Sequence, residues 1–365
     1  MSREPGPLHA VVLAGGAGER FWPASRAHHP KPLLRVAEPG ARTSLLAATL
    51  ERAAAFAGPG DTWLVCGREH AAAMRRESGL AAGRVLVEPV RRNTAMAVGA
   101  AAARIAHRHP DAVMVVLPAD HRIPDRTAFA RAIRRAAGAA REGSALVTLG
   151  VEPTRPETGY GYIRLGALGP APLHRVLRFV EKPSRARARR FYESGHYRWN
   201  AGIFVWTARV ILEEIEEHAP ELHRALAPLR TAPRGASRAW WSAALARAYR
   251  RAPSLPIDVA VLERSRRVWC LPVAFRWSDV GTWESLAETL GVGPGVTRVI
   301  EGDAVLCDAG GNLVWGADRP IALLGVSGLA VVDAGDALLV ASLERSGELR
   351  EVVRRLRRRG RDDLV

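Results

Sequence analysis

Two lysines stand out because the chain has no others. Among its 53 lysine and arginine residues, only Lys31 and Lys182 are lysines. Lysine presents a compact ammonium and arginine a planar fork, so the two are not interchangeable where a point charge must meet a phosphate. Lys31 lies in His29-Pro-Lys-Pro-Leu33 and Lys182 in Val180-Glu-Lys-Pro183, where proline stiffens the adjacent backbone. We predict that both lysines bind phosphate; the alternative is that they are ordinary surface charges.

A glycine-rich loop precedes Lys31 and reads Leu13-Ala14-Gly15-Gly16-Ala17-Gly18-Glu19-Arg20. Glycines let backbone N–H groups approach phosphate oxygens closely, and the Arg20 guanidinium adds a two-pronged donor. The loop is not a Walker loop, because no Gly-Lys-Ser/Thr follows, and it lacks the third glycine of a dinucleotide-binding motif. It predicts a polyphosphate site of another type, with a purely structural turn as the alternative.

Asparagine is nearly as scarce as lysine. Asn93 lies in Arg-Arg-Asn-Thr-Ala and Asn200 in Trp-Asn-Ala-Gly, and both are candidates for ligand binding. Asn312 follows Gly310-Gly311, and we expect it to be a turn residue that tolerates positive φ.

The elements that position these residues alternate in type up to about residue 150. Apolar runs at 10–13, 62–66, 112–117 and 145–149 are typical of strands, and the patterns at 44–56, 94–107 and 127–141 are typical of helices. This alternation predicts an α/β fold, with a Rossmann-like, mostly parallel sheet covered by helices on both faces. Ligands bind such sheets beyond the carboxyl ends of strands, so we expect the chemistry after Leu13, Leu117 and Val180.

The order of elements becomes mixed from residue 151 to 290. After the breaker Gly291-Val-Gly-Pro-Gly295, short strand-like runs recur at Val305, Leu313, Ile321, Leu329 and Leu338. They predict a small β-rich unit, compatible with a few coils of a left-handed β-helix, that ends in a helix spanning 349–356. We therefore predict two domains, 1–290 and 291–365.

Composition limits the function classes. The formal net charge of +16 is compatible with nucleic-acid binding, but the arginines are scattered over helices without interleaved aromatics, which favours small polyanions instead. The first apolar run is too short for a membrane span and lacks the charged, apolar and cleavage-site layout of a signal peptide, which predicts a cytoplasmic protein. Cys66, Cys270 and Cys307 are odd in number, lie far apart and are not accompanied by a set of histidines at metal-ligand spacing, so we expect buried thiols and neither disulfides nor a zinc site.

The glycine loop followed by Pro-Lys31-Pro resembles the nucleotide-sugar pyrophosphorylase family. Further segments, in the same order, resemble its bacterial mannose-1-phosphate guanylyltransferases over nearly the whole chain: Arg20-Phe-Trp-Pro-Ala-Ser-Arg26, Glu88-Pro-Val-Arg-Arg-Asn-Thr-Ala95, Leu117-Pro-Ala-Asp-His121, Val180-Glu-Lys-Pro183, Trp199-Asn-Ala-Gly-Ile-Phe204, Ile257-Asp258 and Trp277-Ser-Asp-Val-Gly-Thr-Trp283. The resemblance implies that 1–290 is a nucleotidyltransferase domain.

It also implies roles for individual residues. Nucleotide binding falls to Leu13, Ala14, Gly15, Gly16, Gly18, Arg20, Glu88, Asn93 and Thr94. Sugar-phosphate binding falls to Gly161, Glu181, Lys182 and Asn200, metal binding to Asp120 and Asp279, and catalysis to Arg20, Lys31 and Lys182. From the sequence alone, either aspartate could instead cap a helix or shape a turn. Where the family often has Asp-Tyr-Ala, this chain has Asp258-Val259-Ala260, which leaves the role of Asp258 open.

The resemblance implies an enzyme that uses Mg²⁺, GTP and mannose 1-phosphate to form GDP-mannose and pyrophosphate. One alternative is the same chemistry with another nucleotide or sugar, such as glucose 1-phosphate. Another is a catalytically silent subunit that senses nucleotide sugars. We expect no nucleic-acid or membrane partner and no isomerase domain after Val365. A homodimer is compatible with the resemblance, although the sequence does not fix the oligomeric state.

Overall fold

The computed structural model describes residues 6–16, 18–36, 43–169, 172–316 and 319–365. Nine strands form the large sheet within these residues: β1 (Leu8–Ala14), β2 (Thr62–Gly67), β3 (Val85–Glu88), β4 (Val113–Pro118), β5 (Leu146–Val151), β6 (Tyr162–Leu168), β7 (His174–Val180), β8 (Tyr197–Thr207) and β9 (Val268–Val273). Their order across the sheet is β3-β2-β1-β4-β8-β5-β9-β7-β6.

Strands β3, β2, β1, β4, β5 and β9 all run in one direction, and β8 runs against its neighbours β4 and β5. This antiparallel strand brings its first residues to the edge of the sheet where β1 and β4 end. The long strand β8 therefore delivers Asn200 to the edge at which an α/β sheet binds its ligands.

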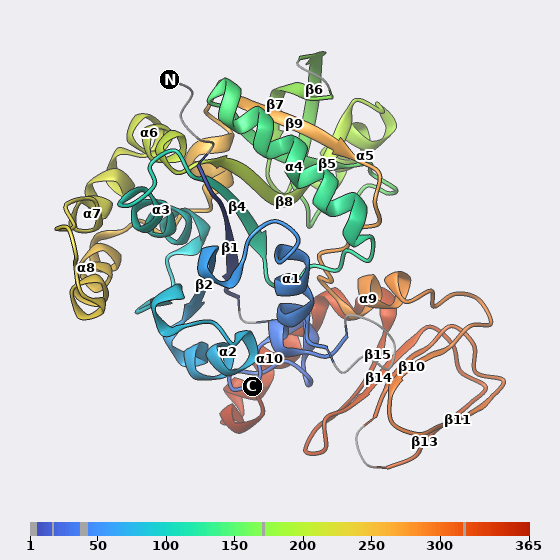
Figure 1. Cartoon of the computed structure of the whole chain (residues 1–365). Helices are drawn as coiled ribbons and strands as arrows, with labels where there is room; N and C mark the ends of the chain where they lie inside the picture. The colour runs from blue at the N-terminus through green and yellow to red at the C-terminus, as the bar shows by residue number, and fades with distance from the viewer. Residues whose placement is uncertain (1–5, 17, 37–42, 170–171, 317–318) are drawn as a thin grey trace.

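Helices cover both faces of the sheet, as the sequence predicted (Figure 1). Their bounds are α1 (Leu45–Ala53), α2 (Ala71–Ser78), α3 (Asn93–Ala106), α4 (Arg126–Gly143), α5 (Arg185–Glu193), α6 (Ala208–His218), α7 (Pro220–Arg230), α8 (Arg238–Arg251), α9 (Trp283–Thr289) and α10 (Leu349–Arg358). One core packs α3, α6, α7 and α8 on the sheet, and the core of the other face is built around α4. The α/β prediction is confirmed.

The C-terminal unit consists of β10 (Arg298–Glu301), β11 (Ala304–Cys307), β12 (Leu313–Trp315), β13 (Ile321–Leu324), β14 (Leu329–Asp333) and β15 (Leu338–Ser342), followed by α10. Strands β10, β12 and β14 stack in parallel, β11 and β13 do the same in a second sheet, and β15 closes the first sheet antiparallel. Alternate strands thus repeat in two stacks, which is the arrangement of a β-helix. The predicted β-rich unit with its terminal helix is confirmed, and we propose that it starts after residue 290.

The two units share a hydrophobic core. Phe21, Trp22 and Trp283 of the first unit pack in one cluster with buried residues of β12, β14 and α10. The Trp22 indole N–H donates to the carbonyl oxygen of Leu364 at 2.7 Å. The C-terminal unit therefore lies directly against the segment that follows the glycine loop.

Two expectations for the C-terminal unit are wrong. The positive φ expected for Asn312 belongs instead to Gly311, at φ 73°. The side chain of Asn312 is fully buried, donates to Val326 O at 3.0 Å and accepts from Leu329 N at 3.0 Å. These bonds tie successive coils together. Cys307 is exposed because it ends β11, whose side chains face outward, whereas Cys66 and Cys270 are buried as expected.

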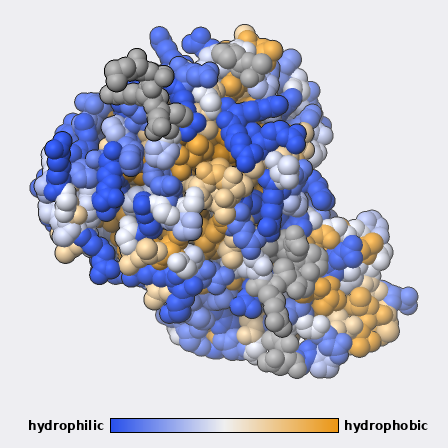
Figure 2. All heavy atoms as spheres, in the orientation of Figure 1, coloured by the Kyte–Doolittle hydropathy of each residue, from blue (hydrophilic) through white to orange (hydrophobic). Residues whose placement is uncertain are grey.

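Hydrophobic side chains gather on the outside of the C-terminal sheets, where Figure 1 places β11 and β13 (Figure 2). Val305, Leu306 and Leu324 are exposed there. No helix within the described residues combines the length and the apolar character needed to cross a membrane.

Candidate active site

A cleft of about 570 Å³ opens beyond the ends of β1, β3 and β4 and the start of β8. Eleven of the residues singled out in the sequence line it: Leu13, Gly15, Gly16, Glu88, Asn93, Thr94, Asp120, Gly161, Glu181, Asn200 and Asp279. Ala14, Gly18, Arg20, Lys31 and Lys182 are not among its lining residues. Ala14 is buried in β1, so its side chain serves the core.

Lys31 joins the two predicted metal-binding aspartates. Its Nζ lies 2.7 Å from Asp120 Oδ2 and donates to the backbone oxygen of Asp279, also at 2.7 Å. Lys31 begins a short 3₁₀ turn between Pro30 and Pro32, and this turn fixes the backbone that presents the ammonium. Burial opposes the charge on Asp120, but the charge of Lys31 and its hydrogen bond hold the pKa of this carboxyl below its usual value. Asp120 is therefore ionised at neutral pH, as a metal ligand must be.

Tyr160 orients Asp279, a contact that the sequence analysis missed. The Tyr160 hydroxyl donates to Asp279 Oδ1 at 2.8 Å, and its ring packs edge-on against Trp199 and Trp277. Burial, with the adjacent Asp279 carboxylate, raises the pKa of Tyr160, so the hydroxyl stays a donor. The available signal was its position next to Gly161 in a chain with only five tyrosines.

His121 lines the cleft beside Asp120 but is neutral. Burial lowers the pKa of its imidazole to about 4, despite the opposing effect of Asp120 and Asp279. The Trp277 indole N–H lies 3.2 Å from His121 Nδ1, which places the ring proton on Nε2. The geometry supports the expectation that His121 is a hydrogen-bonding neighbour without its own chemistry.

Gly161, Glu181 and Asn200 meet at the other end of the cleft. A Cβ on Gly161 would lie 2.7 Å from Glu181 Oε2 and 3.2 Å from Asn200 Cβ, so only glycine fits there without displacing its neighbours. The backbone N–H of Asn200 also donates to Gly161 O at 2.8 Å. Three separate segments thus form one polar surface: Gly161 lies just before β6, Glu181 just after β7, and Asn200 on β8.

Asp258 fixes the orientation of the Asn200 amide. Asn200 Nδ2 donates to Asp258 Oδ1 at 3.0 Å, while Asn200 Oδ1 accepts from Thr148 and Gly202, both at 3.0 Å. Within the described residues, the second N–H of the Asn200 amide is left for a ligand. Burial, reinforced by the negative charge of Glu181, raises the pKa of Asp258 to about 7.

Lys182 stands apart from this packed surface. Its side chain is exposed, its Nζ pairs with the adjacent Glu181 Oε1 at 2.7 Å, and its backbone has φ 44°, in the left-handed region. That backbone turn places the ammonium directly after β7, at the rim of the polar surface. Lys182 contacts the site through Glu181.

The glycine loop leaves β1 toward the cleft. Gly18 has φ 63°, and a Cβ there would lie 3.0 Å from Lys31 Cβ, so this glycine permits the close packing of the two motifs. Arg20 is half-buried, and its guanidinium has no hydrogen bond or ion pair with any residue that the structure describes. Burial and the charge of Arg350 lower the pKa of Arg20, while Asp279 acts in the opposite direction. A partly buried cation without a carboxylate partner suits an anionic ligand.

Glu88, Asn93 and Thr94 lie on the remaining wall of the cleft. The Tyr249 hydroxyl of α8 donates to Glu88 Oε1 at 2.9 Å, which fixes this buried carboxyl. Asn93 has φ 62°, a conformation that asparagine tolerates better than most residues, and it begins α3. Thr94 Oγ1 accepts from Ile257 N at 2.9 Å, so its side chain joins two segments of the wall.

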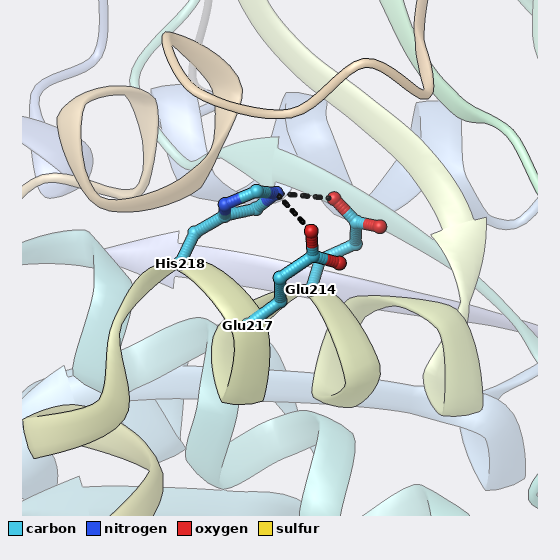
Figure 3. A group of neighbouring side chains, drawn as sticks. All are labelled: Glu214, Glu217 and His218. Atoms are coloured by element: carbon cyan, nitrogen blue, oxygen red, sulfur yellow. Dashed lines mark ion pairs between the residues drawn. The ribbon is translucent and has the colours of Figure 1, made fainter.

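A separate acidic cluster lies on α6 and does not line the cleft (Figure 3). His218 Nε2 lies 3.3 Å from Glu214 Oε2 and 3.9 Å from Glu217 Oε1. Glu214 is nearly fully buried and also pairs with Arg267 Nε at 3.2 Å. Arg267 already pairs with Glu214, so we interpret these residues as a structural cluster at the end of α6.

Comparisons with known proteins agree with this geometry. Residues 9–290 match the model of the nucleotidyl transferase family, and residues 302–356 match that of the mannose-phosphate isomerase/GMP-like β-helix domain. The alginate biosynthesis protein AlgA of Pseudomonas aeruginosa is 35% identical over 359 residues, which cover 97% of this chain and 73% of AlgA. The mannose-1-phosphate guanylyltransferase RfbM of Salmonella typhimurium is 35% identical over 365 residues, with the same coverage.

A solved structure from Thermus thermophilus, described as a mannose-1-phosphate geranyltransferase, is 39% identical. It superimposes with a TM-score of 0.86 over 96% of this chain and 99% of its own. The chain is a nucleotidyltransferase, and it belongs to the nucleotidyl transferase family, in the group that includes the mannose-1-phosphate guanylyltransferases.

Proposed function

We propose that the protein transfers a guanylyl group from GTP to mannose 1-phosphate, giving GDP-mannose and pyrophosphate. The observation that carries this proposal is the position of Lys31, which contacts two aspartates from distant segments that line the cleft, with a glycine loop on one side of the cleft and a polar surface on the other. In the reaction, a phosphate oxygen of mannose 1-phosphate attacks the α-phosphorus of GTP. The bond from that phosphorus to the bridging oxygen breaks, and pyrophosphate leaves.

The site favours this reaction because two polyanions must approach each other. Cations and fixed donors have to offset their repulsion and hold attacking and leaving oxygens in line. We assign the backbone of Gly15, Gly16 and Gly18 with Arg20 to the triphosphate. Lys31 would hold a phosphate oxygen at the reacting centre, and Lys182 the phosphate of the sugar.

The two aspartates suit Mg²⁺, which prefers oxygen ligands and takes few protein carboxylates. The side-chain hydrogen bonds that these carboxylates accept from described residues go to Asp120 Oδ2 and Asp279 Oδ1, so the other oxygen of each carboxylate could bind a cation. Asp120 is also held in its ionised form. When bound, Mg²⁺ would neutralise phosphate charge as it develops.

Selectivity would come from the two walls of the cleft. We assign to Glu88 the role of accepting the N–H donors on the edge of a guanine base, and we assign Asn93 and Thr94, which also line the cleft, to the same nucleotide. Gly161, Glu181 and Asn200 would contact the sugar hydroxyls. Because such contacts set substrate choice independently of the phosphate chemistry, another nucleotide or sugar is the alternative that the experiment must exclude.

The test is pyrophosphate release from each of four nucleoside triphosphates with mannose, glucose or N-acetylglucosamine 1-phosphate. We expect the highest kcat/KM for GTP with mannose 1-phosphate and almost no turnover in chelator. Asp279→Asn removes one anionic ligand at constant size, so raising Mg²⁺ should partly restore its rate. Full turnover in chelator would contradict the metal assignment, and a preference for another substrate pair would contradict the selectivity.

We also propose a homodimer, joined through the exposed apolar side chains Val305, Leu306 and Leu324 of the C-terminal sheets. Light scattering should give twice the chain mass for the wild type and a single chain mass for Leu324→Asp. We retain the expectations of a cytoplasmic location and of no nucleic-acid partner.

A further inference from the structure

A second cavity, of about 640 Å³, lies behind the wall formed by β3 and α3. We call it the arginine cavity, because Arg68, Arg75, Arg104 and Arg238 line it and its described lining includes no aspartate or glutamate. α2 and α8 both contact the edge strand β3 here, and Figure 1 shows both helices on the same side of the molecule. It is larger than the cleft, with which it shares no lining residue.

The four guanidinium groups lack a carboxylate partner in the part of the chain that the structure describes. None of them forms an ion pair with a carboxylate among the residues that the structure describes, whereas arginines elsewhere on the surface commonly pair with Glu or Asp. Like charges gathered without acids repel one another, so the cluster has an unfavourable self-energy that a bound anion would relieve. The arrangement therefore favours a polyanion.

Arg104 is the most constrained of the four. It is partly buried, and its guanidinium lies 4.0 Å from the centre of the Trp241 ring and 5.8 Å from that of Trp63. Burial, together with the charges of Arg108 and Arg84, lowers the pKa of Arg104 to about 10. Stacking fixes the plane of a guanidinium and leaves its N–H edge available, which is the geometry that binds phosphate oxygens.

Most of the remaining wall is apolar. Leu86, Leu229 and Leu245 line the cavity with Trp241, whose side chain is buried. A ligand for this cavity would thus combine a polyanionic part with a flat or apolar part.

We propose that the arginine cavity binds a nucleotide at a second site, with its phosphates on Arg104 and Arg238 and its base against the wall containing Leu86, Trp241 and Leu245. α8 also begins at this cavity with Arg238, so its first backbone N–H groups add to the positive potential. The site is distinct from the cleft in which the proposed reaction occurs.

The experiment is equilibrium dialysis of labelled GTP against the full chain, with binding counted per chain. Arg104→Met keeps an apolar stem against Trp241 but removes the charge, and Arg238→Ala removes a guanidinium at the exposed start of α8. The matched control is Arg247→Met, an exposed arginine of α8 that does not line the cavity.

We expect the wild type and Arg247→Met each to bind a second GTP per chain. Arg104→Met should either fail to bind this second GTP or bind it at least about tenfold more weakly. Arg238→Ala should weaken the same equivalent, which keeps the test decisive if Arg104→Met fails to fold. This difference does not depend on whether the cleft binds GTP, so it is independent of the proposed catalytic function.

Equal numbers and affinities of bound GTP in the wild type and both cavity variants would overturn the proposal. Displacement of the extra equivalent by inorganic tripolyphosphate as readily as by unlabelled GTP would overturn the part that concerns the base.

Discussion

The two lysines of this chain lie in opposite environments. The Lys31 side chain is 10% exposed and is held at 2.7 Å by a carboxylate and by a backbone oxygen. The Lys182 side chain is 63% exposed, and its ammonium pairs with its neighbour Glu181 at 2.7 Å. Residues of the same type, each next to a proline, therefore differ in whether the protein holds the ammonium before substrate arrives.

The difference indicates how the two sides of the cleft are organised. On the Lys31 side, the C-terminal unit braces the segment after the glycine loop, through the bond from Trp22 to Leu364 and a charged contact between Arg26 and Asp336. On the Lys182 side, a packed polar surface ends in an exposed side chain at its rim. We infer that the nucleotide side is preorganised and that the sugar phosphate itself orders Lys182.

The largest effect is expected for Lys31→Met. It should lower kcat by about 10²–10³-fold, because a preorganised donor at the reacting centre is lost. It should also lower the free energy of unfolding by about 3 kcal/mol, since Asp120 would keep its charge without its cation. Steady-state kinetics and urea denaturation measure the two effects. Unchanged stability would show that the Lys31–Asp120 contact is weaker than its geometry indicates.

Lys182→Arg should come next, with a rise in KM for mannose 1-phosphate and a fall in kcat that together exceed about tenfold. Its unfolding free energy should equal that of the wild type, because the side chain is exposed. Arg185→Lys, on the neighbouring helix α5, is the control for a surface exchange. Kinetic constants within about threefold of wild type would show that Lys182 is only a surface charge, so that just one of the two lysines would serve the reaction.

Asp258→Asn tests the packed surface below Lys182 through its pH dependence. Because the folded pKa, about 7, lies above the ordinary value of 3.8, the folded wild type binds the extra proton between these pH values. The free energy of unfolding of the wild type should therefore fall as pH rises from about 4 to 7, and the variant should lack this contribution to the pH dependence. Chemical denaturation of both proteins across this range should show the variant gaining relative stability with pH. A constant difference would contradict the burial of a titrating carboxyl.

The smallest effect is expected for Arg357→Met in α10. Arg357 Nη1 pairs with Glu19 Oε1 at 2.9 Å beside the glycine loop, but both side chains are partly exposed. Such pairs contribute about 0.2–1 kcal/mol, so stability should fall by no more than that and KM for GTP should change by less than about twofold. Thermal unfolding and kinetics check both. A larger change in KM would show that α10 positions the loop through this pair rather than through the shared core.

The sequence by itself determined the residue types and the alternation of elements. Apolar runs and helical patterns are local signals, so the α/β architecture and the C-terminal β-rich unit could be predicted from them. Short elements such as β3, with four residues, and α2 escaped because they carry too few residues for a pattern. The glycine loop and the two lysines could be singled out because each belongs to a short motif of consecutive residues.

Only the tertiary structure decided which groups meet. Lys31 contacts Asp120, 89 residues away, and Asp279, 248 residues away, and neither contact follows from local spacing. The same holds for the bond from Tyr160 to Asp279, the burial that shifts Asp258, and the antiparallel insertion of β8. The two lysines lie in similar motifs but differ in exposure, because the burial of a residue depends on what the rest of the chain packs against it.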